Sequence, residues 1–175
     1  MTWGVWLVAM VGLFWITVGA VYVGSPPTAI GGCVKLTAEG LEAVDPDGSR
    51  AWNWEDLRSA VVEDVPVSGA SGRVSRLIGS MVSAAAGVFL GVGPPEMRLR
   101  LETEGGPEEV TVYAAAAGGY AAREIALSME LLARFVARTA DPRALGVWGR
   151  EHGREGTPPR AEREALLEAW TRPET

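Results

Sequence analysis

The residues that most often carry chemistry are few in this chain of 175 residues, and they are scattered along it. Cys33 is the only cysteine and His152 the only histidine, so one chain can form neither a disulfide nor a zinc site of cysteine and histidine ligands. His152 lies among Gly, Arg and Glu residues, which is typical of a solvated loop, and a Ser-His-acid triad has little support. We therefore predict no enzyme, no catalytic residues, no cofactor and no metal.

Four acidic residues form a cluster of candidate ligands in the sequence: Asp45, Asp47, Glu55 and Asp56. A calcium loop needs oxygen ligands at fixed intervals over about twelve residues, and the sequence DPDG at 45–48 lacks the rest of that pattern. The same stretch is a strong turn sequence, because proline presets φ and glycine accepts a positive φ. A solvated turn is the favoured interpretation.

Four tryptophans are the candidate interaction residues. Trp52 and Trp54 stand at alternate positions of a predicted strand, which places both on one face as core or interface anchors. Trp148 and Trp170 are the obvious docking groups of the C-terminal tail. We expect the tail to pack back on the domain, with docking on a partner as the alternative, because so short an isolated helix is unstable.

The overall charge excludes one class of partner. The formal net charge is -6 with 16 basic residues, and nucleic-acid binding requires a clustered positive field. We therefore predict no nucleic-acid partner. Apolar residues make up 47% of the chain, which is typical of a folded protein.

The N-terminal segment carries no charge from Trp3 to Val23. About 20 apolar residues in a helix span a hydrocarbon layer, so the segment predicts a transmembrane anchor over residues 1–24. A cleaved signal peptide is the alternative, but the segment begins without Arg or Lys and its apolar run is long. We expect a single-pass protein of the cell membrane, with the C-terminal side in the cytoplasm because all basic residues follow the helix.

The remaining chain predicts strands followed by a helix. A linker over 25–32 precedes short strand patterns, and residues 97–103 and 109–113 form a predicted hairpin. Apolar residues repeat at helical spacing over 119–138. The main domain is expected over 33–140, and a polar tail with a short helix over 141–175.

The hydrophobic stretch inside 67–95 has a second pattern. Small residues recur every four positions and would allow close packing of another helix: Ser75, Gly79, Ser83, Gly87 and Gly91. The stretch could be a membrane-associating helix, a second span over 74–93, or a soluble insertion. We favour one domain with a membrane-associating insertion, because a second span would separate strands expected to share a sheet.

The sequence GLEAVDPDGSRAWNWEDLRSAVV, within residues 34–65, and the later hairpin and helix resemble bacterial pleckstrin-homology (PH)-like domains. In that resemblance, Trp54-Glu55-Asp56-Leu57 stands at the break between two strands. It implies a bent antiparallel β-barrel or sheet capped by a C-terminal helix, hence an α+β fold. It also implies a binding platform without catalysis. The first hairpin is acidic here, so the lipid-headgroup site of related domains is not expected.

These observations together predict a non-catalytic, membrane-anchored PH-like scaffold module that recruits or regulates a protein partner. The alternative is a two-span accessory subunit of an integral membrane complex.

Overall fold

The computed structural model describes residues 8–28, 31–69 and 94–173, and these form two antiparallel sheets and three helices. The first sheet contains β1 (Val8–Val11), β2 (Phe14–Thr17), β3 (Val21–Val23), β4 (Cys33–Leu36), β5 (Gly40–Asp45) and β6 (Gly48–Asn53). A 3-10 turn, η1 (Trp54–Asp56), leads to the second sheet of β7 (Leu57–Glu63), β8 (Glu96–Thr103) and β9 (Gly106–Tyr113). The helices are α3 (Ala122–Val136), α4 (Arg143–His152) and α5 (Arg160–Thr171).

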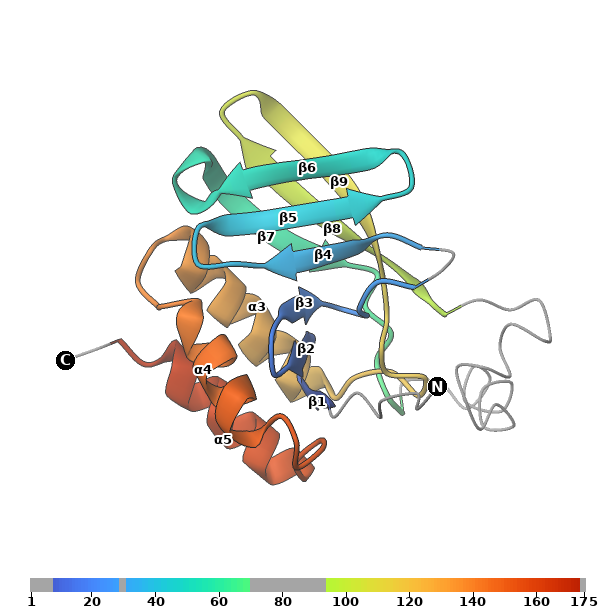
Figure 1. Cartoon of the computed structure of the whole chain (residues 1–175), viewed down its shortest axis with the longest axis vertical. Helices are drawn as coiled ribbons and strands as arrows, with labels where there is room; N and C mark the ends of the chain where they lie inside the picture. The colour runs from blue at the N-terminus through green and yellow to red at the C-terminus, as the bar shows by residue number, and fades with distance from the viewer. Residues whose placement is uncertain (1–7, 29–30, 70–93, 174–175) are drawn as a thin grey trace.

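Neither sheet closes on itself. The strands follow one another in sequence order in both sheets, from β1 to β6 and from β7 to β9. The α+β class is confirmed, but the closed form of the predicted barrel is wrong. Figure 1 shows the helices gathered beside β1 to β3, while β5 and β6 lie at the far end.

The predicted N-terminal transmembrane helix is wrong, because residues 8–23 form three strands instead. Gly12, with a φ of 58°, turns the chain between β1 and β2, in a conformation that glycine adopts at little cost. A second turn follows β2, where the Thr17 N–H and hydroxyl both donate to the Ala20 carbonyl, at 2.8 and 2.9 Å. These turns divide an apolar run long enough for one span into pieces of three or four residues.

The burial of this segment explains why it has no polar face. Alternate residues such as Ala9, Val11 and Ile16 are fully buried, while the residues between them, such as Met10 and Trp15, are partly buried. The structure contains no helix, within the residues it describes, that is both long and apolar enough to cross a membrane. The predicted single-pass membrane localisation is therefore wrong. The hydrophobic insertion and any second span at 74–93 lie outside the described residues.

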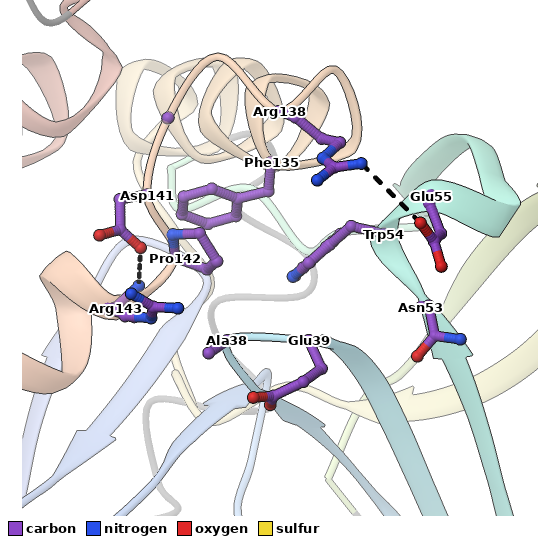
Figure 2. Close-up of a pocket in the computed structure, with 11 residues that line it drawn as sticks. Ala38, Glu39, Asn53, Trp54, Glu55, Phe135, Arg138, Asp141, Pro142 and Arg143 are labelled. Atoms are coloured by element: carbon purple, nitrogen blue, oxygen red, sulfur yellow. Dashed lines mark hydrogen bonds and ion pairs between the residues drawn. The ribbon is translucent and has the colours of Figure 1, made fainter.

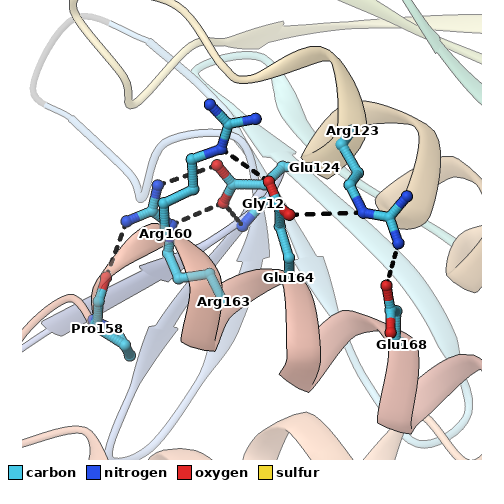
Figure 3. Close-up of polar contacts among 8 residues, drawn as sticks. All are labelled: Gly12, Arg123, Glu124, Pro158, Arg160, Arg163, Glu164 and Glu168. Carbon is cyan, nitrogen blue, oxygen red and sulfur yellow. Dashed lines mark hydrogen bonds and ion pairs between the residues drawn. The ribbon is translucent and has the colours of Figure 1, made fainter.

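A buried carboxylate joins the N-terminal hairpin to two helices (Figure 3). Glu124 of α3 is 3% exposed, and its two oxygens receive Nε and Nη2 of Arg163 on α5 at 2.7 and 2.9 Å. Oε1 also accepts the Gly12 N–H at 3.3 Å, and the Ser128 hydroxyl accepts the Leu13 N–H at 3.1 Å. Hydrogen bonding to the carboxylate raises the pKa of Arg163. Three segments far apart in the sequence thus meet at one group.

The C-terminal helices are part of the folded core. Leu145 of α4 and Leu167 of α5 are fully buried, and α5 packs along α3. Arg123 of α3 pairs with Glu168 and, at 3.5 Å, with Glu164 on α5. The expected packing of the tail on the domain is confirmed, although it contains two helices rather than one.

The predicted hairpin and long helix are both confirmed. Met97, Leu99 and Leu101 alternate as buried residues along β8, as their spacing predicted, and β9 pairs with β8 along its whole length. Leu132 and Phe135 of α3 are buried against the strands. Tyr120 precedes this helix and is 4% exposed, and burial raises the pKa of its phenol.

The turn at Gly12 provides a direct test of the N-terminal strands. A Cβ at this position would lie 2.1 Å from the Ser128 hydroxyl oxygen, in a backbone conformation that side chains rarely adopt. Gly12→Ala should therefore lower the free energy of unfolding by about 2 kcal/mol or more in urea titrations. Gly19→Ala is the matched control, because a Cβ there meets no atom within 4 Å. Equal small effects of both variants would contradict the hairpin.

Candidate functional site

A pocket of about 410 Å³ opens where η1, the β4–β5 turn and the C-terminal end of α3 meet. Figure 2 shows its side chains converging from these parts of the chain and from the segment that joins α3 to α4. The lining residues are Ala38, Glu39, Asn53, Trp54, Glu55, Phe135, Arg138, Ala140, Asp141, Pro142 and Arg143. The pocket is therefore built from segments separated by about half of the sequence.

The base of the pocket is aromatic. Trp54 and Phe135 are 6% and 1% exposed, and their rings pack in a tilted arrangement with centroids 5.7 Å apart. Trp54 Nε1–H donates to the Thr37 carbonyl at 3.2 Å, which fixes the indole and satisfies its only donor. The indole is thus held in place at the base of the pocket, with little of either ring exposed.

The rim of the pocket carries both signs of charge (Figure 2). Arg138 lies 3.9 Å from Glu55, and both side chains are about two-thirds exposed. The Asp141 carboxylate accepts the backbone N–H of Arg143 at 2.9 Å and so orders the start of α4. Exposed ion pairs contribute little to stability, so these charges remain available to a ligand. The pocket can hold an apolar side chain and pair with charged groups beside it.

Arg138 has an unusual backbone conformation, with a φ of 59°. It follows the C-terminal end of α3, where the Thr139 N–H donates to the Arg134 carbonyl at 2.9 Å. Glycine is the usual residue at this place, since a side chain in the left-handed region costs about 1 kcal/mol. Strained residues of this kind cluster at functional sites, and Arg138 is positioned by the strain over the pocket.

The predicted pair Trp52 and Trp54 contact different elements. Trp52 of β6 is 8% exposed, and its Nε1–H donates to the Glu108 carboxylate of β9 at 3.1 Å. The Arg50 guanidinium lies over its ring, 5.3 Å from the centroid, and pairs with the same carboxylate. Trp52 therefore ties the two sheets together, and Trp54 forms the pocket.

Trp148 and Trp170 lie together between α4 and α5. Their rings meet edge to face with centroids 6.1 Å apart, and His152 stacks on Trp148 at 5.3 Å. His152 Nδ1 is buried and has no hydrogen-bond partner among the described residues. These groups form a contact between helices away from the pocket. The small-residue row from Ser75 to Gly91 lies outside the described residues.

The remaining candidate groups stay apart. Cys33 is 5% exposed, and burial raises the pKa of its thiol, which favours the unreactive protonated form. Asp45 and Asp47 flank one end of β6, while Glu55 and Asp56 follow the other. Within residues 8–28, 31–69 and 94–173, no three His, Cys, Asp or Glu side chains gather as metal ligands would.

Sequence reasoning missed Phe135, Arg138 and Arg143 as pocket residues. Phe135 belongs to the core stripe of α3, and its second role depends on where η1 packs. One signal for Arg138 is present in the sequence: α3 ends without the glycine that commonly follows a helix, so another residue must take the left-handed conformation there.

Comparison with protein-family models finds no match, and neither the search of curated proteins nor that of solved structures returns a significant match.

The strain at Arg138 predicts a gain in stability when it is removed. Arg138→Gly should raise the free energy of unfolding by about 0.5 to 1 kcal/mol, measured by urea titration, because glycine adopts the left-handed conformation without cost. Ala137→Gly is the control, since Ala137 has a right-handed φ of -73° and glycine there should destabilise. A loss of stability in Arg138→Gly would contradict the strained geometry.

Proposed function

We propose that this chain is a non-catalytic binding module that recruits a protein partner through the pocket at Trp54. The observation that carries the proposal is the combination of a rigid aromatic base with a rim of mixed charge. Protein interfaces concentrate their binding energy on buried aromatic groups and arginines surrounded by polar residues. Trp54 and Arg138 supply these groups at one place, and Phe135 packs against the indole of Trp54.

A binding role agrees better than catalysis with the positions of the reactive side chains. His152 stacks on Trp148 between α4 and α5, and Cys33 is a buried thiol in β4. Nucleophilic and general-base catalysis need such groups within hydrogen-bond reach of each other. Neither group lines the pocket.

The proposed PH-like relationship has support in the order of elements. Strands β4 to β9, with η1 at Trp54-Glu55-Asp56, precede the amphipathic helix α3 as the resemblance implied. Domains of that kind serve as binding platforms without catalysis. The first sheet, however, begins with three additional strands from residues 8–23.

Position-specific photo-crosslinking in cells of the source organism tests the proposal. A benzophenone amino acid is placed at Glu39 or Arg143 on the pocket rim, and as a control at Arg154, which is exposed after α4. We expect a protein adduct of one defined mass from the two rim positions and none from Arg154.

The second arm adds Arg138→Glu to each of the two rim variants. Loss of the Arg138 guanidinium should remove the adduct at both rim positions, because arginines at the centre of protein interfaces carry a large share of the binding energy. Adducts that form equally at Arg154, or that persist unchanged in Arg138→Glu, would contradict recruitment through this pocket.

A further inference from the structure

Strand β6 ends the first sheet, and no described strand pairs with its outer edge (Figure 1). Opposed residues of an antiparallel pair alternate between those that exchange hydrogen bonds and those that do not. The pairing of Gly48 with Asp45 closes a two-residue turn, and the Trp54 N–H donates to the Glu39 carbonyl at 2.9 Å. The backbone N–H and C=O groups of the even-numbered residues from 48 to 54 are therefore directed towards β5.

The odd-numbered residues of β6 consequently direct their backbone groups outward. These are Ser49, Ala51 and Asn53, and all three are exposed. No hydrogen bond among the described residues uses their N–H groups. Among the described residues, these three N–H groups and the carbonyls of Ser49 and Ala51 have no backbone partner, while the Asn53 carbonyl begins the 3-10 turn η1. Such a row of groups is a template for an added strand.

The other end of the same sheet is covered, whereas no described residue covers the outer edge of β6 by a backbone hydrogen bond. At β1, the outward N–H of Met10 donates to the Thr157 hydroxyl at 3.0 Å, so the loop between α4 and α5 covers that edge. Natural edge strands are also blocked by lysine, internal proline or a bulge. The register of β6 is continuous over six residues, its sequence GSRAWN has no lysine or proline, and its one charged side chain, Arg50, pairs with Glu108.

The charges beside β6 indicate the chemistry of a partner. Asp45 and Asp47 lie before the strand, and Glu55 and Asp56 lie after it, all of them exposed. Arg50 is the only basic residue of β6, and Glu108 pairs with it at 3.4 Å. An added strand would thus have carboxylates at both of its ends, and Arg138 lies 3.9 Å from Glu55 at one of them.

We propose that the free edge of β6 binds an extended, basic segment of a partner protein by strand addition. The inference rests on the proposed function and specifies the partner's chemistry. Asn53, Trp54 and Glu55 line the pocket and lie at or directly after the end of β6, so a bound segment that continues past Asn53 reaches the aromatic base. Backbone hydrogen bonds to Ser49, Ala51 and Asn53 supply affinity, while the terminal carboxylates select basic residues.

A second copy of this chain fits the edge less well. Antiparallel pairing of two β6 strands about Ala51 would place Ser49 opposite Asn53 and bring Asp47 towards Glu55 of the other copy, just beyond both ends of the pairing. Like charges directly opposite each other destabilise a sheet. Charge complementarity therefore favours a basic partner.

Fluorescence anisotropy with the full-length protein tests the proposal. The probe is a labelled nine-residue peptide of alternating Thr and Val with Arg at each end, since residues opposite Asp47 and Glu55 are eight positions apart. We expect saturable binding that weakens as salt rises. A peptide with Glu at both ends, and a basic peptide N-methylated at alternate amides, should each bind at least about ten-fold more weakly.

Two variants assign the binding to β6. Ala51→Pro removes an outward N–H and leaves the hydrogen bonds between β5 and β6 intact. It should weaken binding of the basic peptide by at least about ten-fold. The double variant Asp47→Lys with Glu55→Lys should weaken binding of the basic peptide to a similar extent while leaving the backbone groups of β6 unchanged. Glu151→Lys with Glu162→Lys carries the same charge change on exposed helix positions and should leave the affinity unaltered.

The outcomes separate this inference from the proposed function. Binding that survives Ala51→Pro and the Asp47/Glu55 reversal would overturn strand addition, as would equal affinity for the acidic peptide. Concentration-dependent dimers in sedimentation that disappear in Ala51→Pro would show that a second copy occupies the edge, and would also overturn it. Crosslinking at Glu39 and Arg143 does not depend on this peptide. Recruitment through the pocket could therefore still be supported by that experiment when strand addition is overturned.

Discussion

The buried Glu124 carboxylate holds together the parts of this fold that lie farthest apart in the sequence. It receives two donors from Arg163 on α5 and the backbone N–H of Gly12 at the turn between β1 and β2. Burying the carboxylate and most of the Arg163 side chain, which is 19% exposed, carries a desolvation cost, so the pair adds little net stability compared with apolar packing. Removal of one partner, however, leaves an uncompensated buried charge. The group therefore acts mainly by fixing how the hairpin and α5 dock on α3.

This constraint separates a closed end of the molecule from an open one. Around Glu124, the hairpin, α3 and α5 cover each other, and the Thr157 hydroxyl covers the edge of β1. At the opposite end, no described strand pairs with the outer edge of β6, and η1 borders a pocket with the end of α3. Because α3 contributes Glu124 to one end and Phe135 to the other, with Arg138 just beyond it, the docked helix also sets the geometry of the pocket. The proposed binding surfaces therefore depend on the contact of Glu124 with Arg163 and Gly12, at the other end of α3.

The sequence predicted the elements whose signals are local. Met97, Leu99 and Leu101 alternate on β8, and the apolar stripe of α3 has helical spacing, so both were recognised. The prediction for the N-terminal run is wrong because the run is apolar at nearly every position, so it shows neither the alternation of a strand nor the spacing of an amphipathic helix. Its strands depend on a turn at Gly12 that is held by Glu124, 112 residues away. The pocket was found only in part, since Trp54 stands in a recognisable motif but Arg138 joins it through tertiary packing.

The most direct test of the role of Glu124 is a double-mutant cycle of Glu124→Gln and Arg163→Met, read by urea unfolding and by amide hydrogen exchange at Gly12 and Leu13. Each single variant should lose about 3 kcal/mol, and the pair should lose well under the sum, because the second change removes the unpaired charge. The exchange rates of Gly12 and Leu13 should rise in Glu124→Gln before global unfolding. Additive losses within about 0.5 kcal/mol, with unchanged exchange at Gly12, would contradict the role of Glu124 as the point that joins the hairpin, α3 and α5.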